Sequence, residues 1–147
     1  MSLIAALGCI GVLLLLAPAA VVLGNSPCAR KVIYAVSGIV SATIAVAGLA
    51  ALLSPESSIN ETLSLPLGLP WLGAHFRLDR LSAFFLIVVD FGAAVASLYA
   101  IGYGMGEQAQ SRILPFYPVF LAAMNLVVLS DDAFMFLVSW EFMSLTS

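Results

Sequence analysis

Five apolar runs dominate this chain and limit what it can fold into. They cover about residues 3–23, 32–53, 81–103, 113–130 and 133–147. A helix of roughly 20 apolar residues crosses the ~30 Å hydrocarbon core of a bilayer. The first four runs approach or meet that length, and the fifth is still apolar where the chain stops. The sequence therefore predicts an all-α integral membrane protein with about five transmembrane helices.

The composition supports lipid as the solvent of this chain. Hydrophobic residues make up 63% of the sequence and charged residues 9%, and the mean hydropathy is +1.13. Soluble domains carry about 25% charged residues, so this chain has too little polar surface for a soluble globular fold. The net charge of −3 leaves no basic face, which argues against a nucleic-acid partner.

The segments between the runs are short except for residues 54–80. Within that long segment, residues 62–67 alternate polar and apolar side chains, which predicts a short strand or hairpin at the membrane surface. His75 is expected in a loop, as an amphipathic ring at the membrane–water interface. Asp131 and Asp132 are expected to form a tight turn between the last two helices.

Lysine and arginine positions give a weak preference for one orientation. With the N-terminus outside, Arg30, Lys31 and Arg112 lie on the inner side, and Arg77 and Arg80 lie on the outer side. Inner loops carry the excess of basic residues in membrane proteins. The count favours the N-out orientation by one residue.

Classical sites of soluble enzymes are not found in the sequence. Cys9 lies in the first apolar run and Cys28 in the following loop, at spacings that fit neither a disulfide nor a metal site. Phosphate loops, dinucleotide fingerprints and catalytic triads are also missing. We expect a chain that binds no cofactor and performs no bond-making chemistry itself.

Two acids are expected deep in the membrane. Asp90 and Glu141 each lie about nine residues into a helix, which is ~13 Å at 1.5 Å per residue. An ionisable group at this depth costs at least ~2.5–3.5 kcal/mol on insertion scales, so it persists where it is paired, hydrated or protonated. Both are candidate proton-path residues. The alternative is a neutral, hydrogen-bonded carboxyl that holds two helices together.

Three further residues are candidates for a supporting role. Asn125 in the fourth run could form a hydrogen bond between helices, which is its more ordinary role. Ser144 lies three residues after Glu141 on the same helical face, where it could bind the carboxyl, hold a water molecule or simply pack. Trp140 directly precedes Glu141.

From about His75 onward the sequence resembles a known family of membrane subunits. The segments are residues 76–85 (FRLDRLSAFF), 97–103 (SLYAIGY), 116–124 and 136–147 (FLVSWEFMSLTS). The last is similar to a "WExMxLxS" signature and is the most specific. The family that the chain resembles is that of the antiporter-like subunits of respiratory complex I, of hydrogenase-4 and formate hydrogenlyase, and of multisubunit sodium/proton antiporters. The form "SWEFMSLTS" most resembles hydrogenase-4 component B.

The resemblance implies roles and boundaries. Glu141 would be the essential acid of the fifth helix, acting with a lysine on a seventh, broken helix. Asp90 has no counterpart that we can place. Residues 1–74 would hold two transmembrane helices and an outer loop, and residues 75–147 the start of the proton-translocating domain. The chain would be the N-terminal part of a larger helical bundle, because family members contain many more helices.

The resemblance implies proton movement coupled to electron transfer on partner subunits, in a multi-pass protein of the cell inner membrane. Its partners would be the lipid bilayer, other membrane subunits and the redox arm of a hydrogenase or dehydrogenase. A sodium/proton antiporter subunit of the same fold is one alternative. A membrane scaffold without transport activity, or a gene fragment, is another.

Overall fold

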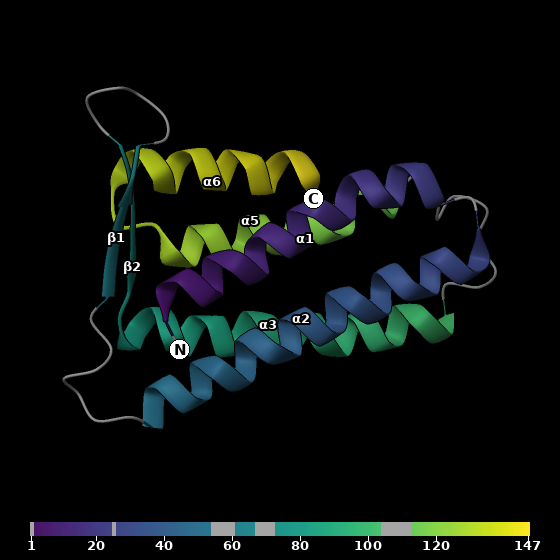
Figure 1. Cartoon of the computed structure of the whole chain (residues 1–147), viewed down its shortest axis with the longest axis horizontal. Coiled ribbons are helices and arrows are strands. Elements are labelled where there is room, and N and C mark those ends of the chain that lie inside the picture. The colour runs from purple at the N-terminus through teal and green to yellow at the C-terminus, as the bar shows by residue number, and fades with distance from the viewer. Residues whose placement is uncertain (1, 25, 54–60, 67–72, 104–112) are drawn as a thin grey trace.

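A computed structural model describes residues 2–24, 26–53, 61–66, 73–103 and 113–147 of the chain. The described part is a helical bundle with a small hairpin at one end (Figure 1). Its helices are α1 (Leu3–Leu23), α2 (Pro27–Leu53), α3 (Arg80–Tyr103), α5 (Phe116–Leu129) and α6 (Ala133–Thr146), and its strands are β1 (Glu61–Leu65) and β2 (Ala74–Leu78). The predicted all-α membrane fold is confirmed.

Helix α2 begins earlier than the sequence analysis expected. Its first residue is Pro27 rather than Val32, so Arg30 and Lys31 lie in its first turns and not in a loop. Proline suits this first position, because its fixed φ is helical and it has no N–H that would stay unpaired. The expected start was wrong because Arg30 and Lys31 lower the local hydropathy, so the apolar run of the sequence begins after them.

The helices pack side by side along the long axis of the bundle (Figure 1). The most extensive contact joins α2 to α3, and α5 packs between α1 and α6. The α2–α3 contact is close, because a Cβ added to Gly38 would lie 2.9 Å from the Cβ of Ser97. About three turns further along α2, toward the hairpin end, a Cβ on Gly48 would meet Ile87 at 3.2 Å.

The hairpin pairs β1 with β2 in antiparallel register, from Glu61 opposite Leu78 to Leu65 opposite Ala74. Strand β1 confirms the strand expected near residues 62–67. Strand β2 is a correction, because His75 lies in it and not in a loop. Phe76 also forms a bridge with Ser130, which ties the hairpin to the connection between α5 and α6.

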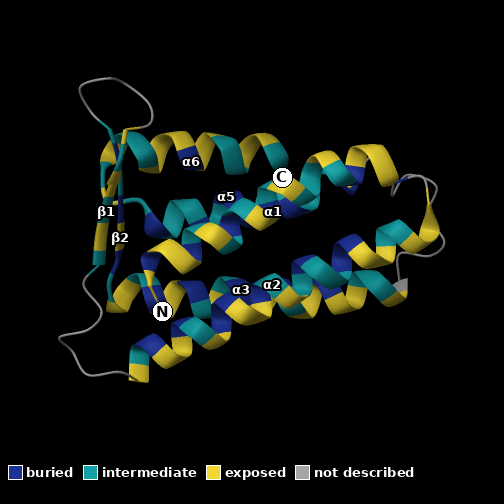
Figure 2. Cartoon of the chain, in the orientation of Figure 1, coloured by how far each residue is buried: buried dark blue, intermediate teal, exposed yellow. Residues whose placement is uncertain are grey.

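The outer surface of the bundle is apolar, as Figure 2 shows by its exposed helical faces. Ile4, Leu15, Leu98 and Leu145 each expose at least 70% of their surface. Among the described residues, α1, α2 and α3 are long and apolar enough to cross a membrane. Helices α5 and α6 have 14 residues each, or about 21 Å at 1.5 Å per residue.

The division predicted after residue 74 falls within β2, whose hydrogen-bonded partner β1 lies in the first segment. The helices of the two segments also pack on each other, α2 against α3 and α1 against α5. The two-part division stays a prediction. Residues 104–112, with Arg112 that was expected on the inner side, lie outside the described residues.

Candidate functional site

A buried polar pair lies at the centre of the bundle, where α3 meets α5. Asp90 on α3 and Asn125 on α5 are both completely buried. The Nδ2 of Asn125 donates a hydrogen bond to Oδ1 of Asp90 over 3.2 Å. The structure therefore brings together two of the residues selected from the sequence.

The orientation of the Asn125 amide is set by its own helix. Its Nδ2 also donates to the carbonyl oxygen of Leu121, one turn earlier, over 3.1 Å. A carbonyl can only accept a hydrogen bond, so the amide nitrogen must face this side. Both hydrogens of the amide have acceptors, and Oδ1 of Asn125 remains available as an acceptor.

Helix α2 adds hydroxyl groups to the same interface. Ser37 and Ser41 are completely buried, one turn apart. The Ser41 hydroxyl lies near the Asp90 carboxyl without a hydrogen bond of standard geometry. Ser37 Oγ, Ser41 Oγ, Asp90 Oδ2 and Asn125 Oδ1 are buried and have no hydrogen-bond partner in the described structure.

A second polar group lies further along the same helices, toward the α1–α2 connection. The hydroxyl of Tyr117 on α5 lies 2.7 Å from Oγ of Ser97 on α3 and donates to the carbonyl of Ala93 over 3.2 Å. The ring of Tyr34 on α2 packs edge-on against that of Tyr117, with centroids 5.1 Å apart. Two tyrosines therefore lie at this end of the interface.

Glu141 lies apart from this pair. It is an exposed residue of α6, in a shallow groove formed with apolar side chains such as Leu137, Phe142 and Leu145. Trp140 is about half exposed and stacks on Phe136. Ser144 is exposed as well. The described part of the chain supplies no partner for the Glu141 carboxyl, so its predicted role remains a prediction.

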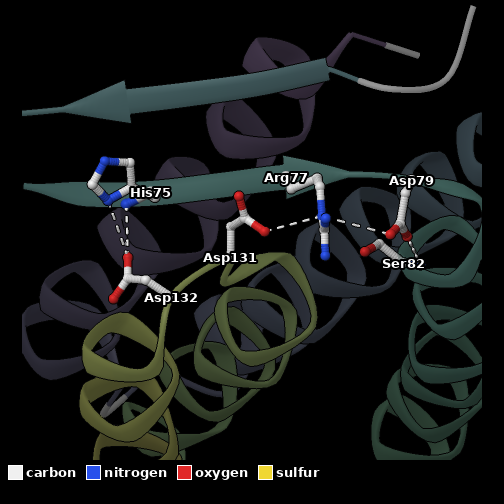
Figure 3. Close-up of polar contacts among 6 residues, drawn as sticks. All are labelled: His75, Arg77, Asp79, Ser82, Asp131 and Asp132. Atoms are coloured by element: carbon white, nitrogen blue, oxygen red, sulfur yellow. Dashed lines mark hydrogen bonds and ion pairs between the residues drawn. The ribbon is translucent and has the colours of Figure 1, made fainter.

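A network of charged residues joins the hairpin to the helix ends, as Figure 3 shows. The backbone N–H of His75 donates to Oδ2 of Asp132 over 3.1 Å, and Nδ1 of His75 lies 3.3 Å from the same oxygen. Asp132 also caps α6 by accepting from the Met135 N–H over 2.8 Å. The bond from Met135 and those from His75 outweigh partial burial and hold the pKa of Asp132 below its ordinary value.

Arg77 connects two further acids in this network. Its Nε lies 3.0 Å from Oδ1 of Asp131 and 3.6 Å from Oδ2 of Asp79 (Figure 3). Asp79 caps α3, because its Oδ1 accepts from the Ser82 N–H over 2.7 Å. Burial alone would raise the pKa of Asp79, but the hydrogen bonds from Ser82 and the charge of Arg77 lower it overall. These contacts anchor the hairpin and do not form an obvious reaction centre.

Metal ligands do not gather in the described part of the chain. No group of three or more histidine, cysteine, aspartate or glutamate side chains there could hold an ion. Cys9 and Cys28 are both free thiols. The expectation that this chain binds no cofactor stays a prediction.

Sequence reasoning missed several residues of the buried interface, namely Tyr34, Ser37, Ser41, Ser97 and Tyr117. Their spacing carries a signal, because Ser37 and Ser41 follow Tyr34 by three and seven residues and so share one helical face. Serine is common in apolar helices, so this spacing marks a functional face of α2 only once the helix that packs against that face is known.

The fold and its buried polar interface define a multi-pass helical membrane protein. No protein-family model matches the chain. Known relatives do. It is 38% identical to hydrogenase-4 component B of Escherichia coli over 76 residues, which is 48% of this chain and 11% of the relative. It is 32% identical to NADH-quinone oxidoreductase subunit L of the same organism over 123 residues, which is 74% of this chain and 20% of the relative.

A third relative is an uncharacterized protein of Mycobacterium tuberculosis, 33% identical over 114 residues, which is 75% of this chain and 17% of that protein. The resemblance drawn from the sequence motifs is confirmed: over its matched part, the chain is homologous to the antiporter-like membrane subunits. The chain spans a fifth or less of the length of these relatives.

Proposed function

We propose that this chain forms the N-terminal part of a proton-translocating membrane subunit in a hydrogenase-4-like, formate hydrogenlyase-like or NADH-quinone oxidoreductase-like complex of the inner membrane. The observation that carries the proposal is Glu141, which follows Trp140 in the signature segment of α6. The names of two relatives, a hydrogenase component and an oxidoreductase subunit, support it. Electron transfer would occur on partner subunits.

The position of Glu141 fits a residue that acts with groups outside this segment. Its helix α6 packs on α5 and contacts β2, while the face with Glu141 is open in the described structure. A charged carboxyl on an apolar face is costly in lipid. In the intact subunit, a further helix with a cationic side chain would cover this face and control the protonation of Glu141.

The test uses the full-length subunit in its complex. Glu141→Gln keeps the shape of the side chain and removes its ability to ionise. In inverted membrane vesicles, we expect electron transfer from the donor to continue while acidification of the vesicle lumen is lost. Asp131→Asn is a matched control, because it makes the same chemical change in a carboxyl outside the helices.

The same assay separates the competing functions. Pumping that persists in Glu141→Gln would contradict the proposal. Proton uptake that depends on added sodium and not on an electron donor would indicate a sodium/proton antiporter subunit. A vesicle that accumulates the protein but shows neither activity would favour a scaffold.

A further inference from the structure

We propose that Asp90 is the proton-binding group of a hydrated pocket between α2, α3 and α5, which opens toward the α1–α2 end of the bundle past Ser97 and Tyr117. This inference deepens the proposed function. Only the role of the bound proton in transport rests on that function, whereas proton binding at Asp90 does not. The pocket is separate from Glu141 and consists of residues of this chain alone.

Four unpaired polar atoms carry the argument. Asp90 Oδ2, Asn125 Oδ1, Ser41 Oγ and Ser37 Oγ belong to side chains with no exposed surface, and none has a hydrogen-bond partner in the described structure. Buried polar groups without partners are rare because each loses its hydration. An internal water molecule needs two to four polar partners. Asp90, Asn125 and Ser41 meet at one interface and supply that number.

The hydrogen bonds around Asp90 indicate which oxygen takes the proton. Oδ1 accepts from Asn125 Nδ2, so this oxygen keeps its donor whether the carboxyl is charged or neutral. Oδ2 has no donor in the described structure. Protonation at Oδ2 therefore requires no rearrangement of Asn125, whose amide is also fixed by the Leu121 carbonyl. The site can gain and lose a proton while the helices stay in place.

The charges around Asp90 favour reversible protonation over a permanent ion pair. The ion pairs of His75 with Asp132 and of Arg77 with Asp79 and Asp131 lie at the hairpin, and none of these three includes Asp90. The titratable group that interacts with it from α1 is Cys9, a thiol. A buried carboxyl without a cation is stable when it is neutral or hydrated.

A strip of polar groups runs from this pocket toward the α1–α2 end of the bundle. Asp90, Ala93 and Ser97 share a face of α3, as residues i, i+3 and i+7 do in any helix. The seven residues from Asp90 to Ser97 correspond to about 10 Å. Ser37 and Ser41 lie along the same stretch of α2, opposite Ala94 and Ser97, because Gly38 contacts Ser97. The Tyr117 hydroxyl, bonded to Ser97 over 2.7 Å, is the outermost group of the strip.

Water access is tested by cysteine labelling in the full-length subunit. Cys9 and Cys28 are first replaced by alanine. Ser41→Cys and Ser97→Cys are then exposed in vesicles to a small, charged thiol reagent, added from the side of the α1–α2 connection. The matched controls are Ile39→Cys and Leu98→Cys, which lie on the same helices but face outward, with 65% and 71% of the native side chains exposed.

The reagent reacts with the thiolate, so a hydrated cysteine should react at least about tenfold faster than one in lipid, where this form is suppressed. Faster labelling of Ser41→Cys and Ser97→Cys than of their controls supports the pocket. Equal or slower labelling overturns it and leaves a dry contact between helices.

Infrared difference spectroscopy tests the proton itself. A change of pH should produce a protonated-carboxyl signal that Asp90→Asn removes and Glu141→Gln retains. A pH response that is unchanged in Asp90→Asn overturns the assignment. Because this readout needs neither pumping nor electron transfer, loss of pumping in Glu141→Gln tests the proposed function without deciding this one.

Discussion

At the scale of single residues, the Asp90–Asn125 hydrogen bond joins two completely buried side chains on different helices. Asn125→Ala removes the donor to Asp90 Oδ1 and leaves this buried oxygen unpaired. Loss of a partner for a buried polar group costs about 1–3 kcal/mol. We expect a lower thermal midpoint for the detergent-solubilised protein, followed by intrinsic fluorescence.

Ser144→Ala is the control for this change, because Ser144 is an exposed residue of α6. Substitutions at exposed positions usually stay within about 0.5 kcal/mol. Equal midpoints for Asn125→Ala and Ser144→Ala would show that the hydrogen bond to Asp90 contributes little to stability.

The sequence identified Asp90, Asn125 and Glu141 because polar side chains at membrane depth are rare and costly. It did not show that Asp90 and Asn125 lie together, since their separation of 35 residues says nothing about which helices are neighbours. Ser37 and Ser41 were missed for the same reason. A small hydroxyl can bond within its own helix, so its importance depends on what the opposite helix presents.

At the scale of helices and strands, the contact between α2 and α3 depends on Gly38. Gly38→Ala places a methyl group 2.9 Å from the Ser97 Cβ, so the helices must separate. Overpacking of this kind costs about 1–3 kcal/mol, more than alanine gains in helix propensity. The expected result is a lower thermal midpoint.

Gly8→Ala on α1 provides the matched control, because a Cβ there would meet nothing within 4 Å. Alanine favours a helix over glycine by about 1 kcal/mol, so Gly8→Ala should be neutral or stabilising. If both variants behaved alike, the close approach of α2 and α3 would not hold in the membrane.

The start of α6 should respond to acid through Asp132. Its pKa in the folded protein is below the ordinary 3.8, chiefly because it accepts from the Met135 N–H. Its contribution to stability is therefore complete above the pKa of the unfolded chain and is lost as the pH falls through the lower, folded value. Hydrogen exchange of the first α6 amides should accelerate as the pH falls through and below the ordinary carboxyl range, beyond the intrinsic change.

Asp132→Asn keeps a capping oxygen but does not titrate, so the extra acid sensitivity should disappear in this variant. Asp132→Ala removes the cap and should cost about 0.5–2 kcal/mol at neutral pH. An unchanged acid response in Asp132→Asn would assign it to another carboxyl of the hairpin network, such as Asp79.

Helix positions followed well from the sequence, because lipid requires long apolar runs. The ends of α1 were predicted to the residue, at Leu3 and Leu23. Strand β2 was not predicted, although its five residues AHFRL alternate apolar and polar side chains. It depends on pairing with β1 and on the contacts of His75 and Arg77 with the start of α6, which no local pattern reveals.

At the scale of the whole molecule, the bundle has two different ends. The hairpin and the Asp131–Asp132 connection lie at one end, and the α1–α2 connection lies at the other (Figure 1). Arg30 and Lys31 are at the second end, in the first turns of α2. Counted together with Arg112, which lies outside the described residues, this side carries three basic residues against Arg77 and Arg80 on the other. The excess of basic residues on the inner side of membrane proteins therefore favours this end as the cytoplasmic one.

Labelling of single cysteines from each side of the membrane tests this arrangement. Native Cys28 is exposed at the start of α2, and Thr62→Cys places a thiol at an exposed position of β1. Cys9 is replaced by alanine in both proteins, and Cys28 is also replaced by alanine in the Thr62→Cys protein. Because α2 is long enough to cross the bilayer, an impermeant reagent should reach the two thiols from opposite sides. We expect Cys28 to react in inverted vesicles and Thr62→Cys in right-side-out ones. Reversed labelling would correct the orientation alone, whereas labelling of both from one side would contradict α2 as a membrane span and, with it, the access path proposed for Asp90.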